Sequence, residues 1–547
     1  MKKLVNDPRH VVREMLEGLC DLHPGLALLD GELVVVRAGL PVPAARPVAV
    51  LSGGGAGHEP AHAGYVGPGL LAGAIAGDVF TSPSVDAVLS GIRAAAGSTG
   101  AVLIVKNYTG DRLNFGLAAE LARAEGIPCE VVVVADDVAL RETVPPERRR
   151  GIAGTVLVHK LAGAAAAAGQ GVAEVAAIAR AAATELGSMG VALGACTVPA
   201  AGKPGFALGE GEIELGLGIH GEQGVERAAM APADALVGRM LGAILADRGL
   251  GAGDRVALLV NGLGGTPPME LSIVARRAIG LLRERGLVVE RAWAGNFLTA
   301  LEMPGCSLSL LKLDDVRLAL LDAPGEAPAW PGPGRIAARA VVVAPPAAPL
   351  TFGAPGPLAP RLQAAGLAVA AALEAAEARL TELDAAAGDG DLGLSMVRGA
   401  AAIRALPEGA WADSPTALAA LGEALRRALG GSSGPFYATG LLRAARAMQQ
   451  GGDWPAAFRA GIVAIAELGG AKPGDRTMLD ALAPAAEALE QGGLAAAAEA
   501  AEQGAAATAA MTPRLGRASY LGARAVGVPD AGAAAVAVWM RALAGAV

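Results

Sequence analysis

A proline- and glycine-rich segment in the middle of this 547-residue chain limits what the chain can fold into. Prolines and glycines recur through residues 327–334, 344–349 and 354–360. Because proline has no backbone N–H and a fixed φ, a segment this rich in proline continues neither a helix nor a central strand. We therefore predict a semi-extended linker at residues 331–360, which joins separately folded regions at residues 1–330 and 361–547.

The region before the linker has the pattern of an α/β domain. Short apolar runs, each closely followed by glycine, asparagine or aspartate, alternate with helical stretches and indicate buried strands in largely parallel sheets. These runs lie at residues 48–51, 101–105, 130–134 and 256–260. A long predicted helix at residues 163–186, followed by a glycine-rich stretch at 187–205, indicates a weaker boundary between subdomains of about 1–187 and 188–330.

The region after the linker has a different pattern. Alanine, leucine, glutamate and arginine recur at helical period in residues 361–385, 414–429 and 481–504, and the segments between them carry glycine, aspartate and serine. This pattern is typical of an all-helical domain, with a bundle of short-looped helices as the simplest arrangement.

Composition and charge exclude several classes of protein. The chain has 45 basic and 53 acidic residues, and its basic run at residues 148–150 is short enough to be a solvated turn, so we expect no nucleic-acid binding. Hydrophobic residues make up 53%, but no long apolar run is free of charges or breaks, so we expect no membrane span. Four scattered cysteines, and an N-terminus without the apolar region of a signal peptide, predict a cytoplasmic protein.

A glycine-rich segment, Ser52-Gly-Gly-Gly-Ala-Gly-His-Glu-Pro60, follows the first predicted strand. Its backbone N–H groups could cradle an anion or a small polar ligand. It is not a dinucleotide fingerprint, because His58 stands where that motif needs its last glycine. A tight structural turn is an equal alternative, since glycine commonly serves turns.

Two further polar loops carry groups capable of catalysis. Lys106 and Asp111 follow a predicted strand, and His220 lies between glycines in a third loop. A histidine taken alone is more often structural than catalytic. Because the carboxyl ends of parallel strands face one crevice, we expect the loops of His58 and Asp111 to lie together. With His220 on a third glycine-rich loop, these residues could supply a nucleophile, an orienting group and a base.

Three aspartates in the helical region predict a metal site. Asp384, Asp389 and Asp391 repel one another unless a cation lies between them, and hard oxygen ligands suit Mg²⁺. The spacing does not match an EF-hand, and a solvated acidic helix end is the alternative. Four glycine-containing loops, at residues 430–436, 469–478, 517–522 and 529–532, could complete a Mg-nucleotide site, although the chain has no P-loop motif.

The ordered set of motifs resembles the single-chain, ATP-dependent dihydroxyacetone (glycerone) kinases over essentially the whole chain. The motifs include the segment at 52–60, Asn107-Tyr-Thr-Gly-Asp111, Gly218-Ile-His-Gly-Glu222, Asn261-Gly-Leu-Gly-Gly-Thr-Pro267 and Leu311-Lys-Leu-Asp314. The helical half adds Gly-Asp389-Gly-Asp-Leu-Gly393, Gly-Gly-Ser432-Ser-Gly-Pro and Lys472-Pro-Gly-Asp-Arg-Thr-Met478. The resemblance implies a two-part α/β substrate domain, an eight-helix nucleotide domain and a domain-swapped homodimer.

The resemblance also implies roles for individual residues. His220 would bind the ketone covalently as a hemiaminal, His58 would hydrogen-bond the substrate, and Asp111 would be the base. The substrate pocket would further include Gly55, Ala56, Gly57 and Lys106. Two Mg²⁺ ions, bridging the phosphates of ATP, would be held by Asp384, Asp389 and Asp391. The nucleotide would be bound by Leu392, Gly393, Leu394, Ser395, Ser432, Ser433, Gly469, Arg476, Met478, Arg517, Asp530 and Gly532.

Some positions depart from the family pattern. Leu392 replaces a common histidine, Val528-Pro529 replaces another histidine-containing pair, and Gln223 stands where proline is common.

Several alternative functions stay open. The chain could phosphorylate a larger ketose such as erythrulose, or also cyclise FAD. It could be a non-catalytic ligand-binding regulator, or a subunit of the phosphoenolpyruvate-driven system.

Overall fold

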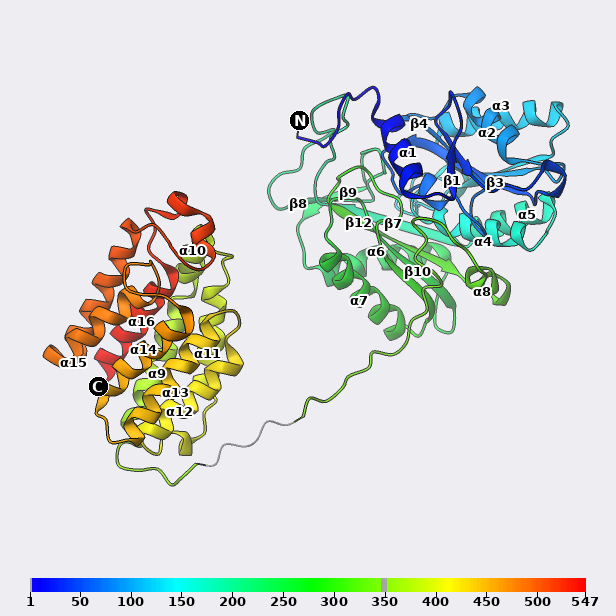
Figure 1. Cartoon of the computed structure of the whole chain (residues 1–547). Helices are drawn as coiled ribbons and strands as arrows, with labels where there is room; N and C mark the ends of the chain where they lie inside the picture. The colour runs from blue at the N-terminus through cyan, green and yellow to red at the C-terminus, as the bar shows by residue number, and fades with distance from the viewer. Residues whose placement is uncertain (1, 346–351) are drawn as a thin grey trace. The chain divides into compact units, whose positions relative to one another are not determined.

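The chain forms two compact units, Met1–Val341 and Val342–Val547, in a computed structural model that describes residues 2–345 and 352–547 (Figure 1). The change from one unit to the other falls inside the linker predicted at residues 331–360. The predicted fold class, an α/β half followed by an all-helical half, is confirmed. Among the described residues, no helix is both long enough and apolar enough to cross a membrane.

The first sheet is mixed, with six strands among the described residues in the order β1-β2-β4-β3-β5-β6. Strands β3, β4, β5 and β6 pair in parallel, and β1 and β2 are antiparallel. Side chains alternate across β3: Val50 packs with helices α1, α4 and α5, whereas Leu51 packs with α2 and α3. The bounds are β1 Leu26–Leu28, β2 Val34–Arg37, β3 Ala49–Ala56, β4 Gly73–Val79, β5 Ala101–Lys106, β6 Cys129–Val134, α1 Val11–Leu22, α2 Val85–Ala95, α3 Thr109–Ala124, α4 Thr155–Ala167 and α5 Val172–Thr184.

The second sheet has the order β11-β10-β12-β7-β8-β9 and is mainly antiparallel. Within the described residues, β10 and β11 form its one parallel pair, so the prediction of largely parallel sheets is wrong here. Apolar, β-branched runs indicate burial on both faces, but they carry no signal for strand direction. The bounds are β7 Leu186–Ala192, β8 Glu212–Leu215, β9 Glu226–Ala229, β10 Arg255–Gly262, β11 Val288–Gly295, β12 Gly305–Lys312, α6 Ala233–Arg248, α7 Pro268–Glu284 and α8 Asp315–Asp322.

Two local predictions are also corrected by the structure. The helix predicted at residues 163–186 is two helices, α4 and α5, and Gly169 between them adopts a φ of 81°. The glycine-rich stretch that follows begins as the buried strand β7 rather than as irregular chain. A side chain at Gly187 would press against Arg248, so this glycine serves close packing inside the sheet.

The glycine-rich segment at 52–60 is likewise largely strand, because β3 continues through Gly53, Gly54 and Gly55 to Ala56. A Cβ at Gly53 would lie 2.2 Å from the carbonyl oxygen of Ile75 in β4. The glycines therefore permit close approach of neighbouring groups, and the predicted turn begins only after Ala56.

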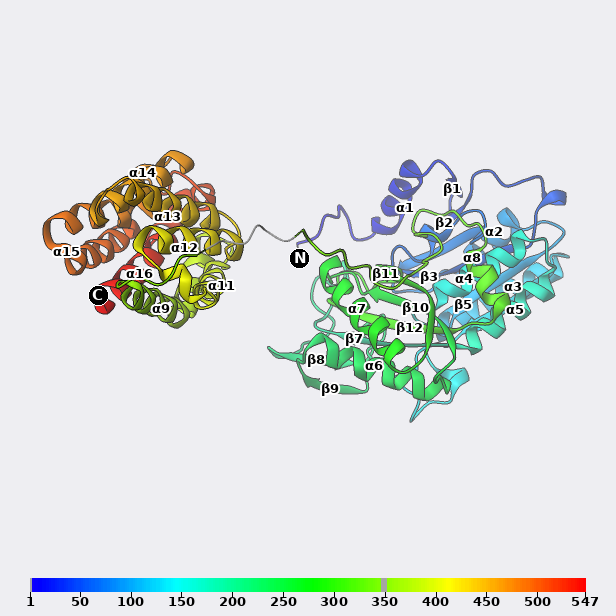
Figure 2. The ribbon, with the colours of Figure 1, turned by 90° about the horizontal axis from the view of Figure 1, so that it is seen from below.

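The helical unit contains eight α-helices, α9 to α16, in its described residues. Figure 2 shows α9 lying beside α11 and α16, with which it packs. Alanine fills much of the core: Ala481, Ala485, Ala497 and Ala501 of α15 are buried against α14 and α16. The bounds are α9 Ala359–Ala375, α10 Glu377–Ala387, α11 Leu392–Arg404, α12 Ser414–Ala428, α13 Ser433–Gln449, α14 Trp454–Gly469, α15 Leu479–Ala507, which kinks at Gly493, and α16 Ala531–Ala546.

Candidate active site

Two histidines predicted to act together meet in the α/β unit. His58 follows β3 and is fully buried, and its Nε2 lies 3.1 Å from Nε2 of His220, in the loop after β8. The rings of Phe80 and Tyr108 stand edge-on to His220, with centroids 5.1 Å and 4.6 Å away. The imidazole of His220 is thus held in an aromatic cage beside His58.

The hydrogen-bond partners define which nitrogen carries a proton. Nδ1 of His58 lies 2.7 Å from the carbonyl oxygen of Thr299, which can only accept, so Nδ1 donates. Burial, followed by the charge of Lys106, holds the pKa of His58 well below its usual range. His58 is therefore neutral, and its Nε2 presents a lone pair toward Nε2 of His220.

Glu222 orients His220 from the other side of its ring. Its Oε1 accepts from Nδ1 of His220 at 2.8 Å, and its Oε2 accepts from the backbone N–H of His220 at 3.0 Å. Burial alone would raise the pKa of Glu222, but the hydrogen bond and charge of His220 lower it to about 2. Sequence reasoning missed this role, although the spacing in His220-Gly-Glu222 is a usable signal.

Replacing Glu222 with glutamine should lower kcat/KM for a ketose substrate by roughly tenfold or more, because the charge that fixes the ring is lost. Steady-state kinetics measure the effect. Glu226→Gln is a matched control on the exposed strand β9 and should be near neutral. Equal kinetics for Glu222→Gln and the wild type would contradict this role. Because the pKa of Glu222 is lowered, the hydrogen-bonded carboxylate of Glu222 stabilises the fold above about pH 4.5, and that stability is lost as the pH falls through about 2.

Lys106 and Asp111 form a second part of the same region. Lys106 ends β5 and is fully buried, and Asp111 lies in the first turn of α3 with 4% of its surface exposed. A Cβ on Gly54 would lie 2.7 Å from Nζ of Lys106 and 3.3 Å from Oδ2 of Asp111. Burial lowers the pKa of Lys106, and the negative charge of Asp111 opposes that shift. An ammonium and a carboxylate therefore face the same glycine.

Gly54→Ala should lower both kcat/KM and the melting temperature. The added methyl group would displace the Lys106 ammonium, and Gly54 has a φ of 151°, which side chains rarely adopt. Kinetics and thermal unfolding measure the two effects. Gly116→Ala in α3 is the control, since a Cβ there meets no atom within 4 Å. Identical behaviour of the two variants would contradict the proposed crowding.

The structure brings most of the predicted substrate residues into one region. Gly55, Ala56 and Gly57 run directly into His58, and a Cβ on Gly57 would lie 2.8 Å from the ring of Phe80. The positive charge of Lys106 lowers the pKa of His58, so the Lys106 and Asp111 side of this region acts electrostatically on the histidine pair.

Only part of the basic run at residues 148–150 is the solvated turn that the sequence predicted: Arg148 is exposed, but Arg149 and Arg150 are not. Arg149 is 4% exposed and donates to both carboxylate oxygens of Asp247 at 2.9 Å. Arg150 donates to Asp137 at 2.8 Å and to the carbonyl oxygen of Gly216 at 2.6 Å. A run of three arginines does not reveal which of them has a buried acidic partner. Here the partners make Arg150 an anchor for the loop that carries His220.

The three predicted metal ligands of the helical unit come together where the last turn of α10 meets the loop before α11. One ligand oxygen from each of Asp384, Asp389 and Asp391 lies within 4.8 Å of the others. Oδ2 of Asp384 also accepts from the backbone N–H of Asp391 at 2.9 Å and of Leu392 at 3.2 Å, which holds the loop closed. Three hard oxygen donors, two of them on exposed residues, fit a hydrated divalent cation such as Mg²⁺.

Asp530 links the last predicted nucleotide loop to this cluster. It caps α16 by accepting from Ala533 N–H at 2.8 Å. Burial raises its pKa to about 6, and the charges of Asp480 and Asp384 add to the rise. A Cβ on Gly532 would lie 3.7 Å from Met478, so these two loops are neighbours.

Arg476 has structural partners in the same region. It is 1% exposed and donates to the carbonyl oxygens of Thr508, Ala525 and Val528. These bonds tie the 508–528 segment to the loop before α15, and a direct role of Arg476 toward nucleotide stays a prediction.

The remaining predicted nucleotide residues lie at helix ends and loops of the same unit, and their roles also stay predictions. The side chain of Arg517 lies outside the described part of the chain. Leu392, Gly393, Leu394 and Ser395 begin α11, Ser432 and Ser433 begin α13, and Gly469 ends α14.

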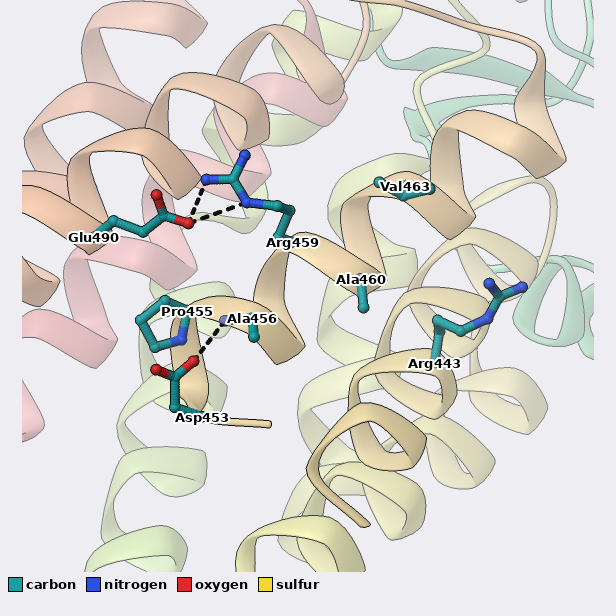
Figure 3. Close-up of a pocket in the computed structure, with 8 residues that line it drawn as sticks. All are labelled: Arg443, Asp453, Pro455, Ala456, Arg459, Ala460, Val463 and Glu490. Atoms are coloured by element: carbon teal, nitrogen blue, oxygen red, sulfur yellow. Dashed lines mark hydrogen bonds and ion pairs between the residues drawn. The ribbon is translucent and has the colours of Figure 1, made fainter. Parts of the chain in front are cut away.

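A separate surface pocket of 620 Å³ lies among α13, α14 and α15 (Figure 3). Arg459 pairs there with Glu490, and Asp453 caps α14. None of the residues predicted to bind substrate, nucleotide or metal lines this pocket, so it is distinct from the sites above.

Comparisons with known protein families cover both units. Residues 17–329 match the Dak1 domain, and residues 386–545 match the DAK2 domain.

Individual relatives align along almost the entire chain. A human protein named triokinase/FMN cyclase is 44% identical and aligns with 99% of this chain and 98% of its own length. D-erythrulose kinase of Mycolicibacterium smegmatis is 40% identical over 100% of this chain and 99% of its own. The crystal structure of the C. freundii dihydroxyacetone kinase in complex with AMP-PNP and Mg²⁺ matches with 36% identity and a TM-score of 0.66 and covers 100% of both chains.

Proposed function

Because this chain belongs to the single-chain dihydroxyacetone kinase family, we propose that it transfers the γ-phosphoryl group of ATP to dihydroxyacetone, giving dihydroxyacetone phosphate. The observation that carries this proposal is the caged His220, held between the carboxylate of Glu222 and the neutral ring of His58. A histidine fixed by two partners on opposite sides is suited to act as a nucleophile.

The proposed first step is hemiaminal formation. In the tautomer whose Nδ1–H donates to Glu222, Nε2 of His220 carries a lone pair, and this lone pair attacks the carbonyl carbon of the substrate. The carbonyl electron pair moves to oxygen, which takes up a proton from water. The ring keeps its Nδ1 proton, and the Glu222 carboxylate balances its positive charge, so the whole ketose is added without loss of water. Glycerol, which has no carbonyl carbon to attack, should be rejected by chemistry rather than by fit.

Asp111 is the proposed base in the second step. It receives the proton of the substrate hydroxyl as the hydroxyl oxygen attacks the γ-phosphorus and ADP leaves. The ammonium of Lys106 beside it offers hydrogen bonds to substrate oxygens. The substrate could also lie against the backbone of Gly55, Ala56 and Gly57, which carry no bulky side chains.

The helical unit is the proposed nucleotide side. Asp384, Asp389 and Asp391 would hold Mg²⁺, two ions according to the family resemblance. Mg²⁺ when bound would neutralise charge on the phosphates of ATP. The loops before α13, α15 and α16 would bind the nucleotide.

The relatives also support two variations on this function. An erythrulose kinase among them favours a test of larger ketoses, because hemiaminal chemistry recognises the carbonyl and not the chain length. A triokinase/FMN cyclase favours a test of FAD cyclisation as a second activity.

The regulator and phosphoenolpyruvate-driven alternatives are less favoured. The candidate nucleophile, base and aspartate cluster are all present in the sequence, and both domains are fused in one chain. Consistent with the family resemblance, we also propose a domain-swapped homodimer. A cytoplasmic location is proposed because all four cysteines are free.

The direct test is ADP release by the purified protein with Mg²⁺, ATP and dihydroxyacetone, without any phosphocarrier protein. A panel of C3 to C5 ketoses and aldoses defines the preferred substrate, and glycerol is the negative control. Absence of turnover with every ketose would overturn the proposed function.

A further inference from the structure

A buried polar chain runs behind the candidate substrate pocket. Nζ of Lys106 lies 3.0 Å from Nε2 of His62, and Nδ1 of His62 lies 3.2 Å from Oγ of Ser52. Nε2 of His159 lies 3.1 Å from the same hydroxyl. All four side chains are buried, with His62 the most exposed at 7%. The mechanism proposed above uses Lys106 and leaves the other three without a function.

The direction of each hydrogen bond follows from its neighbours. The Ser52 hydroxyl donates to the carbonyl oxygen of Ile104 at 2.6 Å, so its lone pairs accept from both imidazoles. His62 therefore carries its proton on Nδ1, and its Nε2 is free to accept from the Lys106 ammonium. Burial, followed by the charge of Lys106, holds the pKa of His62 well below its usual range, so the ring is neutral.

We propose that His62 is a positioning residue for phosphoryl transfer. Its Nε2 accepts a hydrogen bond from the Lys106 ammonium and so holds that ammonium beside Gly54, where the substrate would bind. Ser52 accepts from Nδ1 of His62 and fixes the orientation of the ring. The proposal rests on the proposed function, in which Lys106 binds the ketose. A buried lysine has a flexible four-carbon stem and three donors, so one fixed acceptor directs the remaining two. Because Gly54 has no side chain, the space that Lys106 Nζ and Asp111 Oδ2 both border stays open for the substrate.

A neighbouring cavity makes this role testable by chemical rescue. The cavity has a volume of 590 Å³ and is lined by His62 and Gly54, by Glu59, and by Leu19 and His23 at the α1 side. Removing the His62 ring in His62→Gly would join its space to this cavity, so added imidazole could enter and accept from Lys106. If the His62 ring served only to fill the core, added imidazole would restore the stability of His62→Gly but would not specifically restore its turnover of substrate.

The test compares three substitutions at His62, each first checked for folding by thermal unfolding. His62→Leu fills similar space without an acceptor and should lose about tenfold to a hundredfold in kcat/KM for dihydroxyacetone, with KM for ATP unchanged. His62→Gln, whose amide oxygen can accept from Lys106, should retain activity within about tenfold of the wild type. Added imidazole should raise kcat/KM of His62→Gly but not that of the control His23→Gly.

A His62→Leu variant as active as the wild type would overturn the proposal. So would a folded His62→Gln variant as impaired as His62→Leu, or His62→Gly with no response to imidazole. If His62→Gly does not fold, the comparison of the Leu and Gln variants decides. Wild-type protein that turns over no ketose would instead contradict the proposed function.

Discussion

Replacing His220 with alanine is expected to reduce kcat/KM for dihydroxyacetone by roughly a thousandfold or more. The substitution removes the proposed nucleophile and leaves Glu222 without its imidazole partner. The ketose would then bind only through hydrogen bonds, with its hydroxyl no longer anchored for in-line attack. A coupled assay of ADP release across a range of ketose concentrations measures the loss.

The matched control is His10→Ala, at an exposed histidine preceding α1, which should behave as the wild type. Thermal unfolding of both variants separates loss of chemistry from loss of fold. Wild-type turnover by a folded His220→Ala protein would exclude covalent anchoring at this residue.

Replacing Asp389 and Asp391 together with asparagine should lower kcat by roughly a thousandfold or more, because two anionic ligands of the proposed Mg²⁺ site are lost. Asparagine keeps the side-chain size, and it leaves the Asp384 hydrogen bonds to the loop backbone available. Thermal unfolding of the variant separates loss of metal binding from loss of fold. Kinetics across a Mg²⁺ titration, together with calorimetric binding of a non-hydrolysable ATP analogue, measure the effect.

The control is Glu487→Gln, at an exposed position on α15, which removes a carboxylate elsewhere in the helical unit. The double variant should also still bind dihydroxyacetone, since the candidate ketose residues lie in the other unit. Unaltered Mg²⁺ dependence in the Asp389 and Asp391 variant would contradict the metal assignment.

Much of the fold was predictable because its signals are local. The linker prolines, the apolar strand runs and the helical periods each depend on a few adjacent residues, and the division into an α/β half and an all-helical half followed from them. The antiparallel second sheet was not predictable in this way. The antiparallel pairing of β12 with β7 and with β10 depends on contacts between strands that are far apart in the sequence.

The candidate site shows the same limit. The aspartate cluster was predictable, since its three members lie within eight residues of one another. The glycine-rich loops suggested that His58 and His220 act together, but their direct contact was not predictable, because a separation of 162 residues carries no local signal. The partners of Arg149 and Arg150, and the chain of His62, Ser52 and His159, depend on tertiary packing alone.

The central claim is that a ketose becomes covalently bound to His220 before it is phosphorylated. A crystal structure of the wild-type protein soaked with dihydroxyacetone tests this claim most directly. We predict continuous electron density from Nε2 of His220 to a tetrahedral carbon of the triose, and no such density in His220→Ala. A triose bound in the pocket of an active enzyme with His220 unmodified would contradict it.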